Sequence, residues 1–185
     1  MDISNIWIIS DTHFRHERMH VLCHRPADYN EQIIRHWHEN VKPDDLVIHL
    51  GDVAWPHGWE EGIIHMLPGK KILVRGNHDA KSLPNLMEKG FDIAVDSMSM
   101  KLEGLDILFT HSPQVTHTHD INVHGHLHDM ACPESDCAHW LCSLELQGYR
   151  VQNVRDLIKT WRKLANEKKK IKGGNYDAKC IGNWV

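Results

Sequence analysis

The chain alternates short apolar runs with amphipathic segments. The apolar runs at 6–10, 45–52 and 70–79 are short and end in polar residues, which predicts buried β-strands. In the segment 30–41, apolar residues recur three and four positions apart, which predicts a helix with Asn30 as its N-cap. This alternation of strands and helices favours an α/β fold in the first half of the chain.

Two further helices are expected in the first half. The segment 59–67 has helical periodicity, and Pro68-Gly69 should end that helix. The segment 83–90 predicts a short helix that ends before its final glycine. Both helices would follow strands, as in other α/β proteins.

The second half of the chain is richer in strands. The segment 92–111 predicts two strands joined by a turn, 121–128 a strand followed by a loop, and 139–151 a further strand. The segment 153–170 predicts an amphipathic helix capped by Asn153. No internal repeat or linker divides these elements, so we expect one domain over residues 1–170 and a C-terminal tail over 171–185.

Composition agrees with a globular domain and excludes several classes of protein. The 185 residues are 41% hydrophobic and 25% charged, which suits a chain with a real core. The net charge of −4 gives no general attraction to nucleic acid or acidic lipid. No apolar run approaches the roughly 20 residues that span a bilayer, and the N-terminus lacks a basic signal region. We therefore expect a cytoplasmic protein without a membrane partner.

Histidine is the first chemical signal, with 17 residues in the chain. The stretch NVHGHLH at 122–128 places His124, His126 and His128 at every second position. In an extended backbone these three rings would point to one face and could converge on a metal ion. The pattern alone is only suggestive, because histidine is also common in cores and on surfaces.

The second signal is that polar residues able to bind metal follow one predicted strand after another. The carboxyl ends of strands are where α/β sheets hold ligands. Seven candidate ligands exceed the four of a tetrahedral zinc site and suit two five- or six-coordinate cations that share a carboxylate. The mixture of oxygen and nitrogen donors favours manganese, iron, zinc, cobalt or nickel. The candidate ligands are Asp11, His13, Asp52, Asn77, His111, His126 and His128.

The ordered motifs D-x-H, G-D, G-N-H-D, a lone H and G-H-x-H resemble those of the calcineurin-like metallophosphoesterase superfamily, in particular its compact bacterial and phage-type members. The resemblance covers residues 11–128 through its motifs. It implies two packed mixed β-sheets flanked by helices, in a four-layer α-β-β-α sandwich. It also implies hydrolysis of phosphate esters with two divalent transition-metal ions, of which we expect manganese first.

The same resemblance implies a role for each residue. The first ion would be bound by Asp11, His13 and His128, and the second by Asn77, His111 and His126. The expected catalytic residues are Asp52, which would bridge the ions, and His78, which would act as an acid beside the leaving group while a metal-bridging hydroxide attacks phosphorus. His124 matches no ligand position and is expected to be structural.

One position departs from the resemblance. Many members read G-D-x-x-D, whereas this chain reads Gly51-Asp52-Val53-Ala54-Trp55, so the second acid is missing. In the phosphatases of the superfamily that acid supports the catalytic histidine. The sequence therefore leaves open what orients His78.

Substrate contacts and rival functions complete the expectations. The segment 14–29 would overhang the centre, and His16, Arg25 and Asn77 are the expected substrate-binding residues. A small phosphodiester or nucleotide is the expected substrate. A nuclease acting on DNA or RNA is the first alternative, favoured by the arginines of this segment and by a lysine run at 168–172. A non-catalytic metal-binding scaffold is the second. The sequence does not indicate an oligomeric state.

Overall fold

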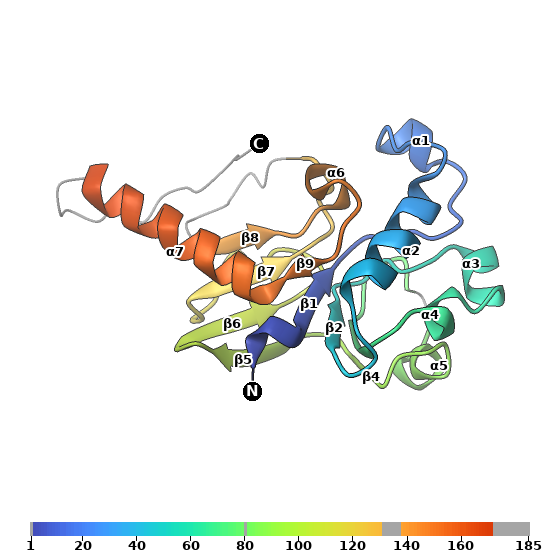
Figure 1. The fold of residues 1–185 in the computed structure, drawn as a ribbon, viewed down its shortest axis with the longest axis horizontal. Coiled ribbons are helices and arrows are strands. Elements are labelled where there is room, and N and C mark those ends of the chain that lie inside the picture. The colour runs from blue at the N-terminus through green and yellow to red at the C-terminus, as the bar shows by residue number, and fades with distance from the viewer. Residues whose placement is uncertain (1, 80, 131–137, 172–185) are drawn as a thin grey trace.

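The computed structural model of the chain describes residues 2–79, 81–130 and 138–171. Two β-sheets pack face to face (Figure 1). The first has strand order β4-β3-β2-β1-β9 and the second β5-β6-β7-β8. The strands are β1 Ile6–Ile9, β2 Leu46–His49, β3 Lys70–Val74, β4 Ile93–Val95, β5 Met98–Leu102, β6 Leu105–Phe109, β7 Ile121–His124, β8 His139–Leu141 and β9 Gln152–Asn153.

Both sheets are mixed. In the first sheet β1 to β4 run parallel and β9 pairs antiparallel with β1. In the second, β5 and β6 form an antiparallel hairpin, whereas β6, β7 and β8 are parallel. The expected α/β fold with two packed mixed sheets is confirmed. Parallel strands bury both faces, which explains why their sequences are continuous apolar runs.

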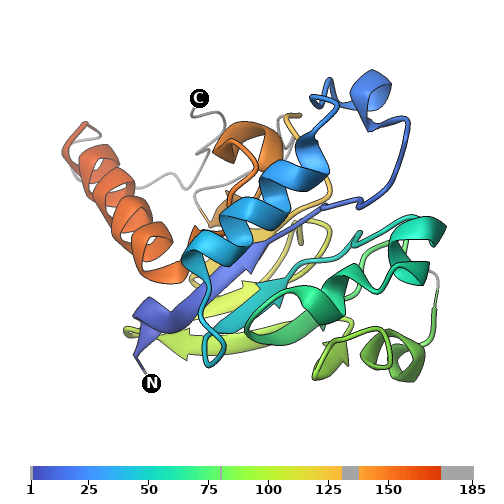
Figure 2. The ribbon, with the colours of Figure 1, turned by 45° about the vertical axis from the view of Figure 1, so that its right-hand side comes forward.

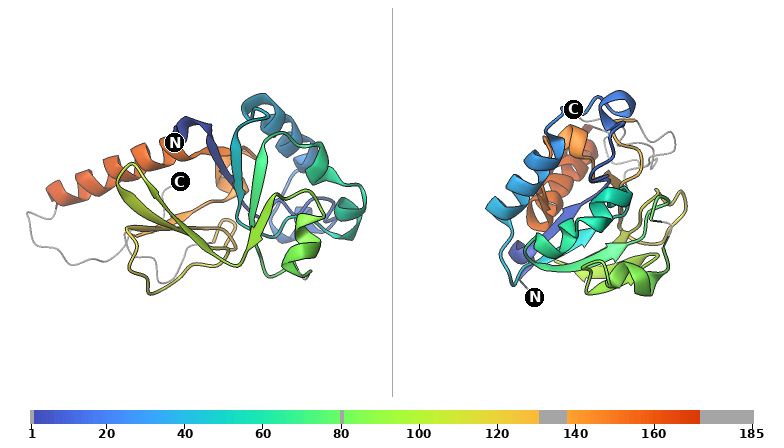
Figure 3. Two further views of the ribbon diagram at one scale, coloured as in Figure 1. Left: turned by 90° about the horizontal axis from the view of Figure 1, so that it is seen from below. Right: turned by 90° about the vertical axis from the view of Figure 1, so that its right-hand side faces the viewer.

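Helices cover the outer face of the first sheet, and Figure 2 shows α2 running across it beside β1. The long helix α7 packs on β1, β9 and the N-terminal 3-10 turn η1, and reaches the end of the molecule opposite α3 and α5 (Figure 3). The helical elements are η1 Ile3–Asn5, α1 Met19–Leu22, α2 Tyr29–Asn40, α3 Pro56–Glu60, α4 Ile63–Met66, α5 Leu83–Met87, α6 Leu144–Gln147 and α7 Val154–Ile171.

Alternating residues of the first sheet serve two hydrophobic cores. Ile9 and Val47 face the helices and pack with Trp37 of α2, which is fully buried. Ile8 and Ile48 face the second sheet instead. Burying such a side chain contributes roughly 1.5–3 kcal/mol. The alternation fixes the register of the sheet, because a shift by one residue would exchange the two faces.

Two predicted helices differ from the structure in the first half of the chain. Helix α2 begins at Tyr29 with Asp28 at the N-cap, so the prediction of Asn30 as cap was wrong. Asn30 lies within the helix, and its Oδ1 accepts the Arg15 backbone N–H at 3.0 Å. The predicted helix 59–67 is two short helices, because Gly62 adopts a left-handed φ of 67° between them.

The predicted pair of strands over 92–111 is three strands. Strand β4 belongs to the first sheet and β5 to the second, so the chain crosses between the sheets after Val95. The turn between β5 and β6 is as expected, since Glu103 and Gly104 both have positive φ. The segment 14–29, which was expected to overhang the centre, contains α1.

Near the C-terminus the agreement is partial. The predicted strand 139–151 contains β8 and the short helix α6. Helix α7 agrees with the predicted 153–170, and Asn153 Oδ1 accepts the Arg155 backbone N–H at 3.0 Å, as an N-cap does. Beyond Ile171 the expected tail lies outside the described residues. No helix within the described ranges combines the length and apolar character needed to span a bilayer.

Candidate metal centre

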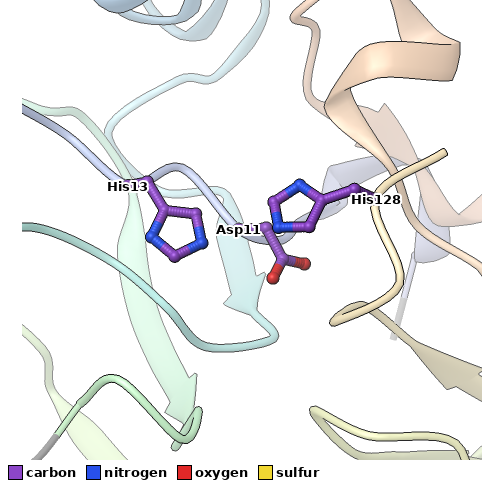
Figure 4. Close-up of side chains that lie close together, drawn as sticks. All are labelled: Asp11, His13 and His128. Carbon is purple, nitrogen blue, oxygen red and sulfur yellow. The ribbon is translucent and has the colours of Figure 1, made fainter. Parts of the chain in front are cut away.

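The expected ligands meet where β1, β2, β3, β6 and β7 reach their carboxyl ends. Two groups have their donor atoms within 4.8 Å of one another, namely Asp11 with His13 and His128, and Asp52 with His111 and His126. Figure 4 shows the first group around one space, with Asp11 and His13 extending from the chain after β1 and His128 from the loop after β7.

The Asp11 carboxylate is the clearest sign of a cation in the first group. Asp11 is 1% exposed, and its Oδ2 accepts the His126 backbone N–H at 2.9 Å. Its Oδ1 is buried and has no hydrogen-bond partner within the described residues. A buried carboxylate oxygen without a partner is costly, and this burial raises the pKa of Asp11. A bound divalent cation would remove that cost.

His13 is in the protonation state that a ligand needs. Burial lowers its pKa to about 3, so the ring is neutral near pH 7. Neutral imidazole binds metal through a nitrogen lone pair, whereas imidazolium does not. The ring of His13 also stacks against the ring of His128, with centroids 5.4 Å apart.

In the second group, acceptor atoms face one another. The Nδ1–H of His111 donates to the Leu50 carbonyl at 2.8 Å. Nε2 of His111 then lies 2.8 Å from Asn77 Oδ1 and 3.1 Å from His126 Nδ1. It also lies 3.4 Å from Asp52 Oδ2. Burial would lower the pKa of His111, but its hydrogen bond to Asp52 and the charge of Asp11 outweigh burial and raise it. A cation that replaced the Nε2 proton would face lone pairs of Nε2, Asn77 Oδ1 and His126 Nδ1, while the Nδ1 proton remains hydrogen-bonded to the carbonyl.

Asp52 lies between the two groups. Its Oδ2 is 3.7 Å from His13 Nε2 and 3.4 Å from His111 Nε2, and its Oδ1 accepts the His78 backbone N–H at 2.8 Å. Burial would raise the pKa of this carboxyl, but the hydrogen bond and charge of His111 outweigh burial and hold the pKa at about 2. Asp52 is therefore a carboxylate positioned to contact two cations.

The backbone that presents these ligands is strained. Asp11, His13 and Asp52 have φ of 53°, 44° and 55°. His126 and His128 have φ of 71° and 52°. Left-handed backbone costs a non-glycine residue roughly 1–2 kcal/mol, and such residues cluster at functional sites. The prediction that strand alternation would align the histidines was wrong, because β7 ends at His124 and the next residues turn.

Glycines and one acid hold the loops together. A Cβ on Gly125 would collide with Ser10 Oγ and the Asp11 carboxylate, and one on Gly76 would collide with Asp52. Asp79 accepts backbone N–H groups from Asp52, Val53 and Gly76 at 2.8, 3.0 and 2.9 Å. Its carboxylate therefore fixes the loop of Asp52 and does not orient the neighbouring His78.

Sequence reasoning missed Glu145, which lies on α6. Its Oε1 accepts a hydrogen bond from His128 Nδ1 at 3.0 Å. Arg25 is paired with the same oxygen, at 2.7 Å from one terminal nitrogen and 2.8 Å from Nε. Hydrogen bonds of this kind fix the tautomer of a ligand histidine. No spacing in the sequence indicated this partner, because the pair is brought together by the fold.

Arg25 does not face the mouth of the centre. Its side chain is 0% exposed, and its guanidinium also donates to the carbonyls of Asp11 at 2.7 Å and Thr12 at 2.9 Å. All these donors are directed at protein atoms. This placement favours Arg25 as a support for the first ligand group over its expected contact with substrate.

The other expected substrate contacts do lie at the mouth. His16 is partly exposed, with its ring 5.9 Å from that of His13. Asn77 and His78 are exposed. The His78 ring lies 5.6 Å from the His13 ring and 6.2 Å from the Trp55 ring. Over the described ranges no carboxylate pairs with the His78 side chain.

His124 lies apart from both ligand groups. It is 1% exposed, and its ring packs at 5.7 Å from the ring of His139 on β8.

A third group of donor atoms, Cys23 with His128 and Glu145, shares its histidine with the first group. Burial raises the pKa of the Cys23 thiol to about 11, so it is protonated and a poor ligand near pH 7.

Comparison with known proteins agrees with this geometry. The family described as calcineurin-like phosphoesterase matches residues 4–172. The uncharacterized protein MJ1445 of Methanocaldococcus jannaschii is 28% identical over 138 residues, which cover 69% of this chain and 72% of that protein. The gene 66 protein of Mycobacterium phage L5 is 29% identical over 167 residues, covering 68% of this chain and 78% of the phage protein.

A solved structure has the same fold. The protein AQ665 of Aquifex aeolicus, described as of unknown function, superimposes with a TM-score of 0.68 and 27% sequence identity. The match covers 84% of this chain and 98% of the Aquifex chain. The chain therefore has sequence relatives in Methanocaldococcus jannaschii and a mycobacteriophage, and shares its fold with a protein of Aquifex aeolicus.

Proposed function

Because the chain belongs to the calcineurin-like phosphoesterase family and is a metal-dependent phosphoesterase, we propose that it hydrolyses phosphodiesters at a centre of two divalent cations. The observation that carries the proposal is the position of Asp52. Its Oδ2 lies within 3.7 Å of His13 Nε2 and 3.4 Å of His111 Nε2, so one carboxylate can serve both ligand groups.

The donor set supports two ions. Asp11, His13 and His128 would hold one, with Asp52 shared. Oδ1 of Asp11, which has no hydrogen-bond partner within the described residues, suits a cation in the first group. Asn77 Oδ1 and His126 Nδ1, which both face Nε2 of His111, suit a cation in the second. The second ion would take Asn77, His111 and His126.

The chemistry of the donors guides the choice of metal. Carboxylate, amide oxygen and imidazole together suit borderline and hard divalent ions, and we propose manganese, with iron, zinc, cobalt or nickel as alternatives. When bound, a pair of such ions neutralises phosphoryl oxygens and lowers the pKa of a coordinated water.

The protein's own residues would then position the substrate and move one proton. His78 is exposed at the mouth and would donate its ring proton to the leaving oxygen. Its backbone N–H is fixed to Asp52 Oδ1 at 2.8 Å, which anchors the residue beside the centre. His16 and Asn77 would contact the phosphoryl oxygens from the rim.

A diester suits the charges around the centre better than a monoester. Arg15 is paired with Glu61 and Glu31, and Arg75 is paired with Asp96. Arg25 is paired with Glu145. These ion pairs leave Arg15, Arg25 and Arg75 unavailable to the second negative charge of a monoester, whereas a singly charged diester can be neutralised by the metal centre alone.

The test is a rate comparison on metal-stripped protein reloaded with Mn²⁺. Bis-p-nitrophenyl phosphate should be hydrolysed faster than p-nitrophenyl phosphate. Asp52→Asn should abolish diester turnover, while the exposed matched control Asp44→Asn should retain it. Folded protein that binds metal but hydrolyses neither ester with any of the five metals would support a non-catalytic scaffold and contradict the proposal.

DNA or RNA stays the alternative substrate. The net charge of −4 opposes it, and the side chains of the lysine run at 168–172 lie outside the described residues. Turnover of single-stranded oligonucleotides with a steep salt dependence would favour the nuclease.

We also propose a cytoplasmic location, which the free thiols of Cys23 and Cys142 support, because disulfides are rare in that compartment.

A further inference from the structure

Trp55 is an exposed aromatic side chain beside the metal centre. It follows the loop of Asp52 and is 40% exposed, although tryptophan is usually well covered. Its position is not loose. The Trp55 backbone N–H donates to the Phe14 carbonyl at 2.9 Å, and Ala54 forms a parallel bridge with Phe14. The indole is thus held on a fixed backbone at the rim.

The imidazole of His16 lies against this indole. The two ring centroids are 4.1 Å apart, with the planes inclined by 49°. Nδ1 of His16 accepts the Arg18 backbone N–H at 3.2 Å, and the His16 backbone N–H donates to Tyr29 Oη at 3.2 Å. The two rings therefore form an aromatic corner that is fixed by hydrogen bonds.

A hollow opens beside this corner. Its volume is about 280 Å³, and Arg15, His16, Arg18, Trp55 and His57 are among the residues that line it. A second hollow of about 700 Å³ shares Arg15, His16, Glu17 and His57 with the first. Together they extend from Trp55, whose ring lies 6.2 Å from that of His78, along α1 and α2.

One side chain in the wall of the first hollow can contact a phosphate group. Arg18 is exposed and, over the described ranges, takes part in no ion pair. Its guanidinium is available to an anion in the first hollow. Arg15, in contrast, is held by Glu61 and Glu31. The wall therefore offers the guanidinium of Arg18 and the exposed carboxylate of Glu17 beside an aromatic surface.

We infer that Trp55 and His16 form a stacking site for a nucleobase of the substrate, so that nucleotide-containing phosphodiesters are preferred over alkyl ones. The inference rests on the proposed phosphodiesterase function. Bases stack on aromatic side chains whatever their sequence, because each base has a π-face. Trp55 stands at the position of the second acid in the G-D-x-x-D motif. It therefore provides a flat aromatic surface near His78 in place of a negative charge.

Binding to metal-free protein tests the site without turnover. By calorimetry, adenosine monophosphate should bind about 5- to 100-fold more tightly than ribose 5-phosphate, which lacks the base. Trp55→Ala should abolish this preference, Trp55→Phe should retain most of it, and Met66→Ala, an exposed side chain on α4, should leave it unchanged. If a short oligoadenylate binds more tightly than the mononucleotide, and Trp55→Ala removes this difference, the stacked base belongs to a nucleic-acid substrate.

Two results would overturn the inference. One is equal binding of adenosine monophosphate and ribose 5-phosphate, and the other is an unchanged preference in folded Trp55→Ala. Failure of the stacking site is distinguishable from failure of the phosphodiesterase. Asp52→Asn should keep the base preference while losing diester turnover.

Discussion

Glu145 accepts a hydrogen bond from Nδ1 of His128 at 3.0 Å, and so connects α6 to the metal centre. A carboxylate only accepts, so Nδ1 of His128 carries a proton, and Nε2 is the ring nitrogen left to bind a cation. Arg25 holds the same carboxylate and the backbone carbonyl of Asp11. One buried ion pair thereby orients two candidate ligands, Asp11 and His128, that lie far apart in the sequence.

The first prediction follows from this contact. Glu145→Gln should weaken the affinity of one of two Mn²⁺ sites by about 10- to 100-fold and leave the other within a few-fold, because a neutral amide orients His128 less firmly. Calorimetric titration of the stripped protein with Mn²⁺ measures both sites. Glu88→Gln, an exposed residue after α5, is the matched control. Equal weakening of both sites would instead indicate a general loss of structure.

The same residue predicts an acid-dependent stability. Burial would raise the pKa of Glu145, but the His128 hydrogen bond and the charge of Arg25 outweigh it and lower the pKa from 4.5 to about 2. Since the folded state prefers the carboxylate, its contribution is fully present above pH 4.5 and is lost as the pH falls towards about 2. The contribution is of the order of 3 kcal/mol.

Urea unfolding of metal-free protein measures this dependence. The difference in unfolding free energy between wild type and Glu145→Gln should narrow as the pH falls from about 5 to about 3. A difference that stays constant over this range would mean that Glu145 titrates in the folded protein as it does in the unfolded chain.

Gly125 should be irreplaceable for a steric reason. Its φ is not positive, so alanine fits the backbone, but the added Cβ would collide with Ser10 Oγ and the Asp11 carboxylate. Gly125→Ala should displace the loop that carries His126 and reduce diester turnover by at least about 100-fold. Gly104→Ala is the contrasting variant, since its Cβ would meet nothing within 4 Å although its φ is +79°. It should lower stability by about 1 kcal/mol and leave turnover intact.

His78 should matter most when the leaving group is poor. A proton donor assists an alkoxide, which is a strong base, far more than p-nitrophenolate, which leaves without protonation. We expect His78→Ala to lower kcat for a dinucleoside monophosphate by about 100-fold or more, and for bis-p-nitrophenyl phosphate by less than about 10-fold. Steady-state kinetics on both substrates measure the two effects. Equal losses would assign His78 to metal or substrate binding instead.

The ligand motifs were readable from sequence because the signals are local. Asp11 and Asp52 each follow a short apolar strand, and parallel strands place their carboxyl ends at one edge of a sheet. Donor chemistry is a property of the residue itself, so the mixed oxygen and nitrogen set could be named before the geometry was known. The same locality explains the success with strands and with α7.

The sequence by itself therefore determined the α/β class, the order in which polar residues follow the strands, and the candidate donor atoms. The tertiary structure alone decided the left-handed backbone at the ligands, the pairing of Arg25 with Glu145 across 120 residues, and the packing of His16 against Trp55. The physical reason is that these features depend on groups distant in sequence. A buried arginine pairs with the carboxylate that the fold places beside it, and local sequence does not identify that partner. Strained backbone persists only where the surrounding contacts enforce it.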